Sequence, residues 1–546
     1  MIEELDPKRW LTLAIVLIAL VIVVVDNTVL TVAIPTIIRE LHTTLPSVQW
    51  VMTGYSLTFA TLLIIGGRLG DLYGARRMFI VGAAFFGVGS LVASIAHSVP
   101  QLLVGEAVIE GIGAAMMMPA TLAILSNTFR GRERATAFAA WGAVAGGAVA
   151  FGPVLGGYLT TYHSWRWAFR INVIVAPLAV VGAILFMRHD TPTGRRGRLD
   201  LPGAVLVAVG AFSLVFGISQ AATYGWWHPL ADASSLWPAT RPVSITPLLF
   251  VLSALALTAF VRVDLHKERR GDSPLFEFGQ LRHRCFRYGL ITSITVAMGQ
   301  LGMLFVLPVF LQDGKQLSAI DNGLWLVPMG LAILLAAQAG GRLTRVLGTT
   351  SIVRFGLILD AGGLVLMGVL LRPGVSFFGL LPATLLFGIG VGLASSQLTN
   401  VILYDIDPDK AGVASGANST VRQVGSALGV AIVGSVLSSQ IIRHATAAVR
   451  DAKLPAAVRE AALTQIRRGG VNLSPSSHPP LELRHALESA VAAASRPSLF
   501  LAAGIVAVGA ALSFLIPPVD QRRLADDEVA LDLYDVAEPV DTHLTH

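Results

Sequence analysis

Long apolar segments recur along the whole chain and constrain its fold more than any other feature. Each segment of about 20 residues or more is long enough to cross the hydrocarbon core of a bilayer. Backbone polar groups find no water there, so a crossing segment must be helical. The sequence predicts an all-α polytopic membrane protein with fourteen transmembrane helices, at residues 10–34, 48–68, 78–96, 101–126, 135–160, 166–187, 200–220, 245–265, 286–311, 321–342, 352–371, 377–402, 411–438 and 497–516.

The composition excludes several other classes of protein. Of the 546 residues, 54% are hydrophobic and 14% are charged, against roughly 25% charged in a soluble domain. The net charge is +6, but the basic residues lie in short loops and form no continuous tract, so we expect no nucleic-acid partner. The single cysteine, Cys285, excludes an internal disulfide and a cysteine-built metal cage. No nucleotide-binding loop or zinc spacing occurs, so we expect no cofactor, no metal and no enzyme.

Arginine and lysine are distributed unevenly between the loops. Alternate loops collect the basic residues, and these loops are residues 76–77, 130–134, 188–198 and 262–287. Basic loops stay on the cytoplasmic side of a membrane. An even number of spans then predicts a multi-pass protein of the cell inner (plasma) membrane with both termini in the cytoplasm.

A charged, glycine-rich stretch, Gly67 to Arg77, lies between the second and third spans and predicts a tight turn at one membrane face. The same residues recur at the same spacing, without a gap, at Gly341 to Gly348. Two copies of one turn predict two pseudo-symmetric six-helix halves.

The two spans that follow the basic linker have no counterpart in this repeat, so we expect six, two and six helices. The first half is residues 1–190, and residues 191–270 form the linker and the two extra transmembrane helices. The second half is residues 271–519, in which the polar stretch 439–496 forms a partly helical outer cap, and residues 520–546 form a cytoplasmic tail.

Three acidic residues lie inside predicted spans, where a charge is costly and usually functional. Asp26 precedes Pro35, which we expect to end the first span at the outer face, and Glu106 with Glu110 enters the fourth span from the same face. Their i,i+4 spacing places both glutamates on one side of a helix. A buried carboxylate can take up a proton and release it when its surroundings change, which predicts a proton-coupling site. The alternative is that each acid is fixed to a polar partner and only holds helices together.

Other polar residues within spans complete a predicted transport path. Arg422 is a buried cation that could pair with one of the acids or form a static contact, and Asp360 is a further intramembrane acid that could snorkel, as could Arg354. Glutamine and asparagine in spans are also common interhelical contacts. We expect the substrate to contact Asp26, Tyr55, Glu110, Gln300, Gln397, Asn400 and Arg422, with Glu106 also lining the pore.

The fifth span is rich in glycine and contains Pro153. Small residues let a neighbouring helix approach closely, and the proline bends the helix. The positions concerned include Gly146, Gly152, Pro153, Gly156 and Gly157.

These motifs together resemble the major facilitator superfamily, in its fourteen-helix drug:proton antiporter branch. The stretch Gly67 to Arg77 is similar to the signature G-x-L-x-D-x-x-G-x-R-[KR], and Gly142 to Gly157 resembles the antiporter signature of span five. Asp26-Asn27-Thr28 resembles the D-x-T motif of the first span. Further similarity lies at Trp50, at Trp165 to Trp167, at Asn172 and at Arg422 to Gly425.

The resemblance implies alternating access by a rocker switch between the two halves. It implies that Asp71 and the nearby Arg76 and Arg77 latch the inner ends of the halves while the carrier faces outward, with Gly67 and Gly74 as conformational residues of the same turn. It also implies that the glycines and proline of span five form a pliant interface. The chain departs from the family signature R-x-x-Q-G in span four, since Ala107 stands at the arginine position and Glu110 at the glutamine position. The role of that arginine is therefore not transferred.

We expect a proton-driven exporter of small amphipathic or cationic compounds, acting as a monomer in the lipid bilayer. An exporter of lipids or lipid-like metabolites would share the fold and most motifs. A membrane sensor or structural protein without transport is the second alternative, although it would have no need for paired buried acids.

Overall fold

Helices form the whole regular structure of the part of the chain that the computed structural model describes. This part comprises residues 7–129, 131–188, 200–229, 240–270, 275–276, 278–406, 411–452, 454–467 and 481–519. The all-helical fold predicted from the apolar segments is confirmed. The predicted tail at 520–546 lies outside the described residues.

The helices fall into three sets along the chain. The first set is α1 (Arg9–Glu40), α2 (Leu45–Tyr73), α3 (Ala75–Ser94), α4 (Val99–Leu102), the π-helix η1 (Leu103–Glu110), α5 (Gly111–Thr128), α6 (Gly131–Tyr162) and α7 (Trp167–Phe186). The second is the pair α8 (Leu201–Tyr224) and α9 (Ile245–Arg270). The third is η2 (Phe278–Arg282), α10 (Arg284–Val309), the π-helix η3 (Phe310–Gly314), α11 (Ala319–Leu347), α12 (Thr349–Leu370), α13 (Phe377–Leu403), α14 (Ala411–Asp451), α15 (Ala456–Arg467) and α16 (Leu481–Ser513).

Every predicted apolar segment coincides with a helix. Eleven helices in the described residues are long and apolar enough to cross a membrane, with α4, η1 and α5 taken as one continuous helix. The long helices α2, α6 and α8 are the three predicted segments outside that number. A count of fourteen crossings therefore stays a prediction.

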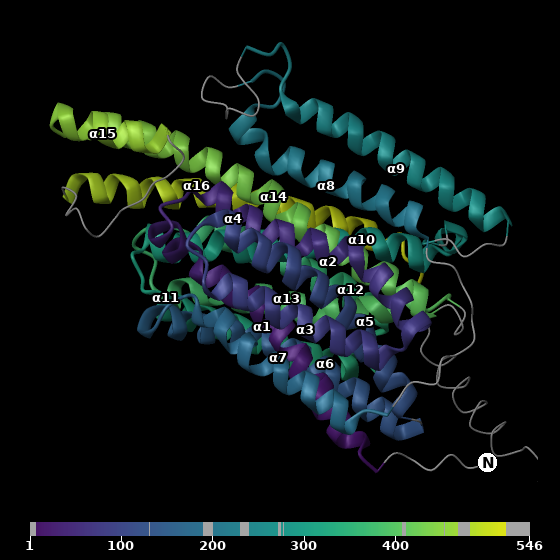
Figure 1. Cartoon of the computed structure of the whole chain (residues 1–546). Coiled ribbons are helices and arrows are strands. Elements are labelled where there is room, and N and C mark those ends of the chain that lie inside the picture. The colour runs from purple at the N-terminus through teal and green to yellow at the C-terminus, as the bar shows by residue number, and fades with distance from the viewer. Residues whose placement is uncertain are drawn as a thin grey trace, which may run out of the picture.

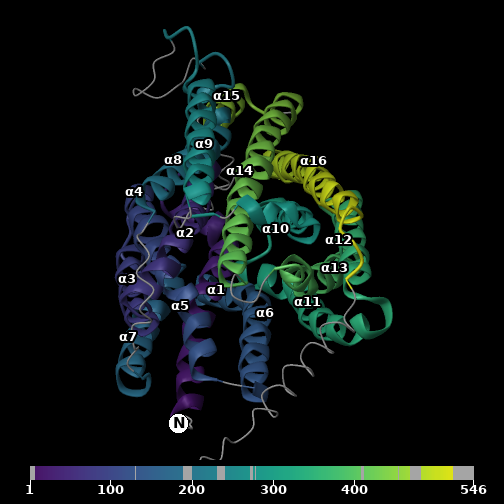
Figure 2. The same ribbon diagram turned by 90° about the vertical axis from the view of Figure 1, so that its right-hand side faces the viewer.

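Helices α1 to α7 form a first group and α10 to α16 a second group. Figure 2 shows them beside each other, the first group in purple and blue and the second in green and yellow. Within the first group α1 packs on α6 and α7, and α2 and α3 pack on α5. Within the second group α10 packs on α14 and α16, and α13 packs on α11 and α12. The two groups meet mainly where α6 packs on α11 and α2 packs on α14.

The stretch predicted as a turn from Gly67 to Arg77 is mostly helical. Helix α2 continues to Tyr73 and α3 begins at Ala75, so the chain reverses at Gly74 alone. Gly74 has φ 98°, and the corresponding Gly348 between α11 and α12 has φ 77°. A positive φ is strained for residues with a Cβ atom, which explains glycine at both positions.

Two further expectations about helix geometry are wrong. Pro35 does not end the first span, because α1 continues through it to Glu40. Its ring is tolerated because an internal proline kinks a membrane helix without necessarily ending it. Glu106 and Glu110 lie on the π-helix η1 and not on an α-helix.

Three helices extend beyond the bundle at one end and pack on each other. The end of α14, helix α15 and the start of α16 share a small apolar cluster of Ala445, Val449, Leu454, Ile466, Leu483, Leu487 and Ala490. Figure 1 shows these helices projecting together from the bundle. We call this the α15 end of the molecule. The predicted cap thus consists largely of continuations of α14 and α16.

The pair α8 and α9 lies along the seam between the two groups. Helix α8 packs on both α2 and α14, and Figure 1 shows the pair beside the bundle. The indole of Trp50 in α2 lies 6.0 Å from the ring of Phe212 and 5.1 Å from that of Phe216, measured between centroids. The Ser435 hydroxyl of α14 donates to the carbonyl of Ile218 at 3.2 Å. Helix α8 therefore contacts both groups at once.

Gly113 lies where the backbones of α3 and α5 pack closely. A Cβ atom at Gly113 would lie 2.5 Å from the amide nitrogen of Phe86 and 2.7 Å from the carbonyl oxygen of Gly82, so the backbones would have to separate. We expect Gly113→Ala to destabilise the protein by about 1–3 kcal/mol, measured by thermal unfolding in detergent. Gly504→Ala is the control, because no atom lies within 4 Å of a Cβ there. Equal stability of the two variants would contradict this account of the interface.

Candidate functional site

The three predicted coupling acids lie together in the interior of the first group. Asp26 stands in the middle of α1, and Glu106 and Glu110 stand on η1. Their exposed fractions are 3%, 2% and 0%. Tyr55 of α2, which is 1% exposed, lies within electrostatic range of all three. We call these four residues the acid cluster.

A hydrogen bond connects the acid cluster to helix α7. The Asn172 amide of α7 donates to Oδ1 of Asp26 at 2.7 Å. The carboxyl groups of Asp26 and Glu110 approach each other closely, and Ser90 of α3 lies beside Glu110. Two carboxyl groups can form a hydrogen bond only when one of them carries a proton, and in this conformation neither oxygen of Glu110 has such a partner.

The remaining polar atoms of the acid cluster lack hydrogen-bond partners. They are Oδ2 of Asp26, Oε2 of Glu106, both carboxyl oxygens of Glu110 and the hydroxyl of Tyr55. None of the three acids forms a salt bridge seen in the described part of the chain. Without a counter-ion or water, a buried carboxylate is costly in its ionised form. The cluster is thus not a static set of ion pairs.

The backbone around the two glutamates is unusual. Residues Leu103–Glu110 form a π-helix, a rare conformation that occurs frequently at functional sites. Gly89 lets α3 approach this segment closely, since a Cβ atom there would lie 2.6 Å from the Glu110 amide nitrogen. The same close packing excludes water from Glu110 in this conformation.

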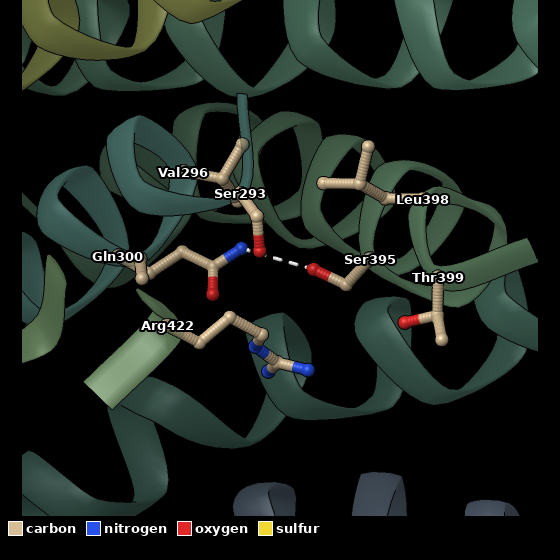
Figure 3. Close-up of a pocket in the computed structure, with 8 residues that line it drawn as sticks. Ser293, Val296, Gln300, Ser395, Leu398, Thr399 and Arg422 are labelled. Atoms are coloured by element: carbon tan, nitrogen blue, oxygen red, sulfur yellow. Dashed lines mark hydrogen bonds between the residues drawn. The ribbon is translucent and has the colours of Figure 1, made fainter. Parts of the chain in front are cut away.

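A second polar group lies in the other half of the molecule. Figure 3 shows Arg422 of α14 below Gln300 of α10 and Ser395 of α13. These residues line a cavity of about 10 Å³. The Gln300 amide donates to the Ser395 hydroxyl at 3.2 Å. Arg422 is exposed although it lies well inside α14, and among the described residues no hydrogen bond or ion pair of its guanidinium is seen. We call this set, completed by Ser293 and Thr399, the Arg422 group.

Several polar residues that the sequence reasoning missed support the Arg422 group. The Ser293 hydroxyl donates to Asn418 at 2.8 Å, and the Asn418 amide donates to Thr399 at 3.4 Å. Two predicted residues lie nearby on α13, where the Asn400 amide donates to the side chain of Gln397 at 3.2 Å. Serine and threonine within apolar spans were the available signal, but these residues also form ordinary interhelical contacts in many membrane proteins.

The acid cluster and the Arg422 group are separate. The pairing of Arg422 with a buried acid, considered from the sequence, is not formed among the described residues. Asp26, Tyr55, Glu106 and Glu110 also do not line open space in this conformation, because each is at most 3% exposed. Gln397 is 5% exposed, whereas Asn400 is exposed.

The glycines predicted to be conformational lie where α6 contacts two other helices. A Cβ atom at Gly156 would lie 2.8 Å from the carbonyl oxygen of Val29 in α1, and Gly152 lies against Thr28. Gly157 packs on the start of α11, and a Cβ at Gly323 of α11 would lie 3.0 Å from the carbonyl carbon of Pro153. Gly146 lies in a part of α6 whose surroundings the structure does not describe. This end of α6 thus joins the two groups at backbone contact distance.

The residues of the predicted latch lie on either side of Gly74. The Arg76 guanidinium is buried and donates to the carbonyls of Ala183 and Ile184 at 3.1 and 2.8 Å, at the end of α7. Arg77 is exposed and Gly67 is partly buried. The side chain of Asp71 lies outside the described residues, so its predicted role is untested.

Polar contacts between the two groups lie near the α15 end. The Gln49 amide of α2 donates to the carbonyls of Val430 and Ala431 at 2.8 and 3.0 Å. The remaining polar contacts of this kind in the described residues join Gln312 to Val32, Ile320 to Thr161, and Arg39 to Asp313. At this end the groups are therefore held together.

No set of three or more histidine, cysteine, aspartate or glutamate side chains in the described residues could hold a metal ion.

Comparison with known proteins identifies relatives along most of the chain. The chain is 36% identical over 436 residues to the puromycin resistance protein pur8 of Streptomyces alboniger, covering 79% of this chain and 82% of that protein. It is 33% identical over 461 residues to the probable actinorhodin transporter of Streptomyces coelicolor, covering 81% and 75%. The fold resembles the crystal structure of a bacterial homolog of the human lysosomal transporter Spinster, in an inward-facing and unoccupied conformation. That match has a TM-score of 0.62 and 16% identity, and covers 94% of this chain and 98% of that one.

The family profile described as Major Facilitator Superfamily matches residues 16–430. These relatives are transporters and resistance proteins, in agreement with a membrane transporter and not an enzyme. The resemblance noted from the motifs is thereby confirmed, and the chain belongs to the major facilitator superfamily.

Proposed function

We propose that this protein is a proton-coupled exporter of small amphipathic or cationic compounds, working by alternating access. The observation that carries the proposal is the acid cluster, in which three carboxyl groups lie together without a basic partner in the described residues. Such a cluster can hold protons while it is sealed and exchange them when water or a cation reaches it. The names of the relatives support antibiotics or other small organic molecules as cargo.

The contacts between the groups suggest which state of the transport cycle the structure represents. The groups are joined near the α15 end through Gln49, Gln312 and the glycines of α6. Arg422 lies about 16 Å along α14 from Ala411, where the helix begins at the end away from α15. Its side chain is exposed. We assign the α15 end to the outside, on the distribution of basic loops, so both termini are cytoplasmic and this state faces inward.

The two groups correspond to the six-helix halves at 1–190 and 271–519, with the pair of helices in 191–270 lying on their seam and the cap of 439–496 outside. In the proposed cycle the contacts of α6 with α11 and of α2 with α14 loosen, so that the acid cluster gains access to outside water. Protons then enter the cluster and drug leaves. During the return to the inward-facing state, before the cluster is sealed as it is here, the protons are released to the cytoplasm, and new drug then binds near the Arg422 group.

Compact packing of each half within a single chain supports action as a monomer in the plasma membrane. The chain supplies both halves itself, so a second copy is not needed to form the path. The fourteen crossings of the proposed topology comprise the eleven apolar helices together with α2, α6 and α8.

Asp26 provides the first test of coupling. In Asp26→Asn the carboxyl group that binds Asn172 and faces Glu110 can no longer exchange a proton. We expect drug-driven proton movement in proteoliposomes to fall to the level of empty vesicles, as measured with an internal pH-sensitive dye.

Asp451→Asn is the matched control, because Asp451 is an exposed acid at the end of α14. This variant should keep the proton movement of the wild type. Undiminished movement in Asp26→Asn would remove Asp26 from the coupling mechanism.

Glu110 distinguishes a proton role from a role in binding cations. If Glu110 also receives a cationic substrate, Glu110→Gln should weaken binding of cationic drugs about tenfold, equivalent to about 1.4 kcal/mol, and leave neutral drugs nearly unaffected. The measurement is equilibrium binding of a matched cationic and neutral pair to the purified protein. Equal loss for both compounds would assign Glu110 to protons alone.

A further inference from the structure

Another buried acid lies outside the acid cluster, in the second group. Asp360 of α12 is 0% exposed, and in the described structure neither of its carboxyl oxygens has a hydrogen-bond partner. It stands eleven residues after the first residue of α12, or about 16 Å along the helix. Asp360 is therefore near the middle of a membrane-length helix.

No basic group in the described residues neutralises Asp360. Helix α13, which packs on it, contains no charged residue. Arg354, on the same helix, donates to the carbonyls of Ser513 and Ile516 at 3.3 and 2.7 Å. Arg496 of α16 donates to the carbonyl of Leu371 at 2.8 Å, beyond the other end of α12.

The remaining charged residues of the neighbouring helices lie toward their ends. In α16 these are Glu482, Arg484, His485 and Glu488, all before Pro497, and in α11 they are Asp321, Arg342 and Arg345. The residues beside Asp360 are apolar, since Leu357, Leu364 and Phe387 belong to one buried hydrophobic cluster.

A carboxyl group in these surroundings is costly without a function. Insertion scales place a charged aspartate at the centre of a membrane helix at about 2.5–3.5 kcal/mol. A structural role would require a hydrogen-bond donor or a basic group that binds the carboxyl. Both carboxyl oxygens lack a hydrogen-bond partner among the described residues. A bound proton removes the charge and with it most of this cost.

The interface that contains Asp360 has the same construction as the interface beside the acid cluster. A Cβ atom at Gly82 of α3 would lie 2.8 Å from the carbonyl oxygen of Gly113, and one at Gly356 of α12 would lie 2.8 Å from that of Gly390. A Cβ at Gly89 would lie 2.6 Å from the amide nitrogen of Glu110. Gly89 follows Gly82 by seven residues in α3, and Gly363 follows Gly356 by seven residues in α12.

The two interfaces exchange the positions of an acid and a phenylalanine. At Gly363, the counterpart of Gly89, a Cβ would lie 2.5 Å from the amide nitrogen of Phe387, so Phe387 takes the place of Glu110. A Cβ at Gly113 would meet the backbone of Phe86, and one at Gly390 would meet that of Asp360. Asp360 thus occupies the place of Phe86. Each interface contains one acid and one phenylalanine, on opposite helices.

We propose that Asp360 is a second proton-binding site of this transporter, located between α12 and α13 and separate from the acid cluster. Asp360 takes up a proton from water while α12 and α13 are apart, holds it in an O–H bond on one carboxyl oxygen while the site is sealed, and returns it to water when α12 and α13 next move apart. Each half then carries a site that exchanges protons. These sites are the acid cluster in the first group and Asp360 in the second. The exchange during transport rests on the proposed proton-coupled export, whereas proton binding itself does not.

Infrared spectroscopy of the full-length protein in lipid vesicles tests proton binding without any drug. A protonated carboxylic acid has a carbonyl band distinct from those of a carboxylate. We expect the wild type at neutral pH to show one such band that Asp360→Asn lacks, while Asp451→Asn leaves the spectrum of protonated acids unchanged. If Asp360→Asn shows the same protonated-acid bands as the wild type, Asp360 is ionised and the proposal is wrong. Asp360→Ser serves as the second variant if Asp360→Asn does not fold.

Proton exchange during transport is tested in vesicles by counting protons moved for each drug molecule exported. We expect the ratio to fall in Asp360→Asn while export continues, in contrast to Asp26→Asn, in which coupling is lost. A ratio equal to that of the wild type would refute the exchange. If the wild type itself moves no protons with drug, the proposed function fails, and the infrared result still decides whether Asp360 holds a proton.

Discussion

The cost of burying a carboxyl group without a counter-ion governs this structure. Asp26, Glu106 and Glu110 are nearly inaccessible to water, and none of them forms a salt bridge seen in the described part of the chain. In such surroundings proton binding and release are coupled to any movement that changes access to water. The close packing at Gly89 and the π-helix that carries the glutamates maintain this exclusion of water. The same packing that builds the fold therefore controls the chemistry of the acids.

The contacts between the two helical groups determine where movement can occur. Near the α15 end the backbones of α6 and α11 touch through Gly157 and Gly323, and the Gln49 amide binds carbonyls of α14. Helix α8 lies across the seam between α2 and α14 and contacts both. A change between inward-facing and outward-facing states would have to break or slide these contacts, whereas most of the packing inside each group can persist, apart from the interface of α12 and α13 at Asp360. The pair α8 and α9 adds a contact surface at the seam between α2 and α14. In the described residues the seam between α6 and α11 has no such added pair.

Local sequence patterns predicted the helices well because the bilayer imposes one length and one polarity on every crossing. They were less successful at helix ends. Pro35 lies within α1, and most of the stretch from Gly67 to Arg77 is helical with a reversal at Gly74. Proline and glycine mark possible ends, but hydrogen bonding and packing along the helix decide whether it continues. The π-helix around Glu106 had no signal in the pattern of apolar residues, because it depends on the contacts of α3 and α2 with that segment.

The sequence by itself determined the all-helical membrane architecture, the family and the identity of the buried acids, since these follow from hydrophobicity and from motifs of adjacent residues. Only the tertiary structure decided which polar residues meet. It placed Asp26 with Glu110 and Asn172, it separated them from Arg422, and it showed that Asp360 lies in an interface built like that of Glu110. The physical reason is that membrane helices of similar composition can pack in many ways, and the partners of a side chain depend on which helix lies opposite and at what rotation.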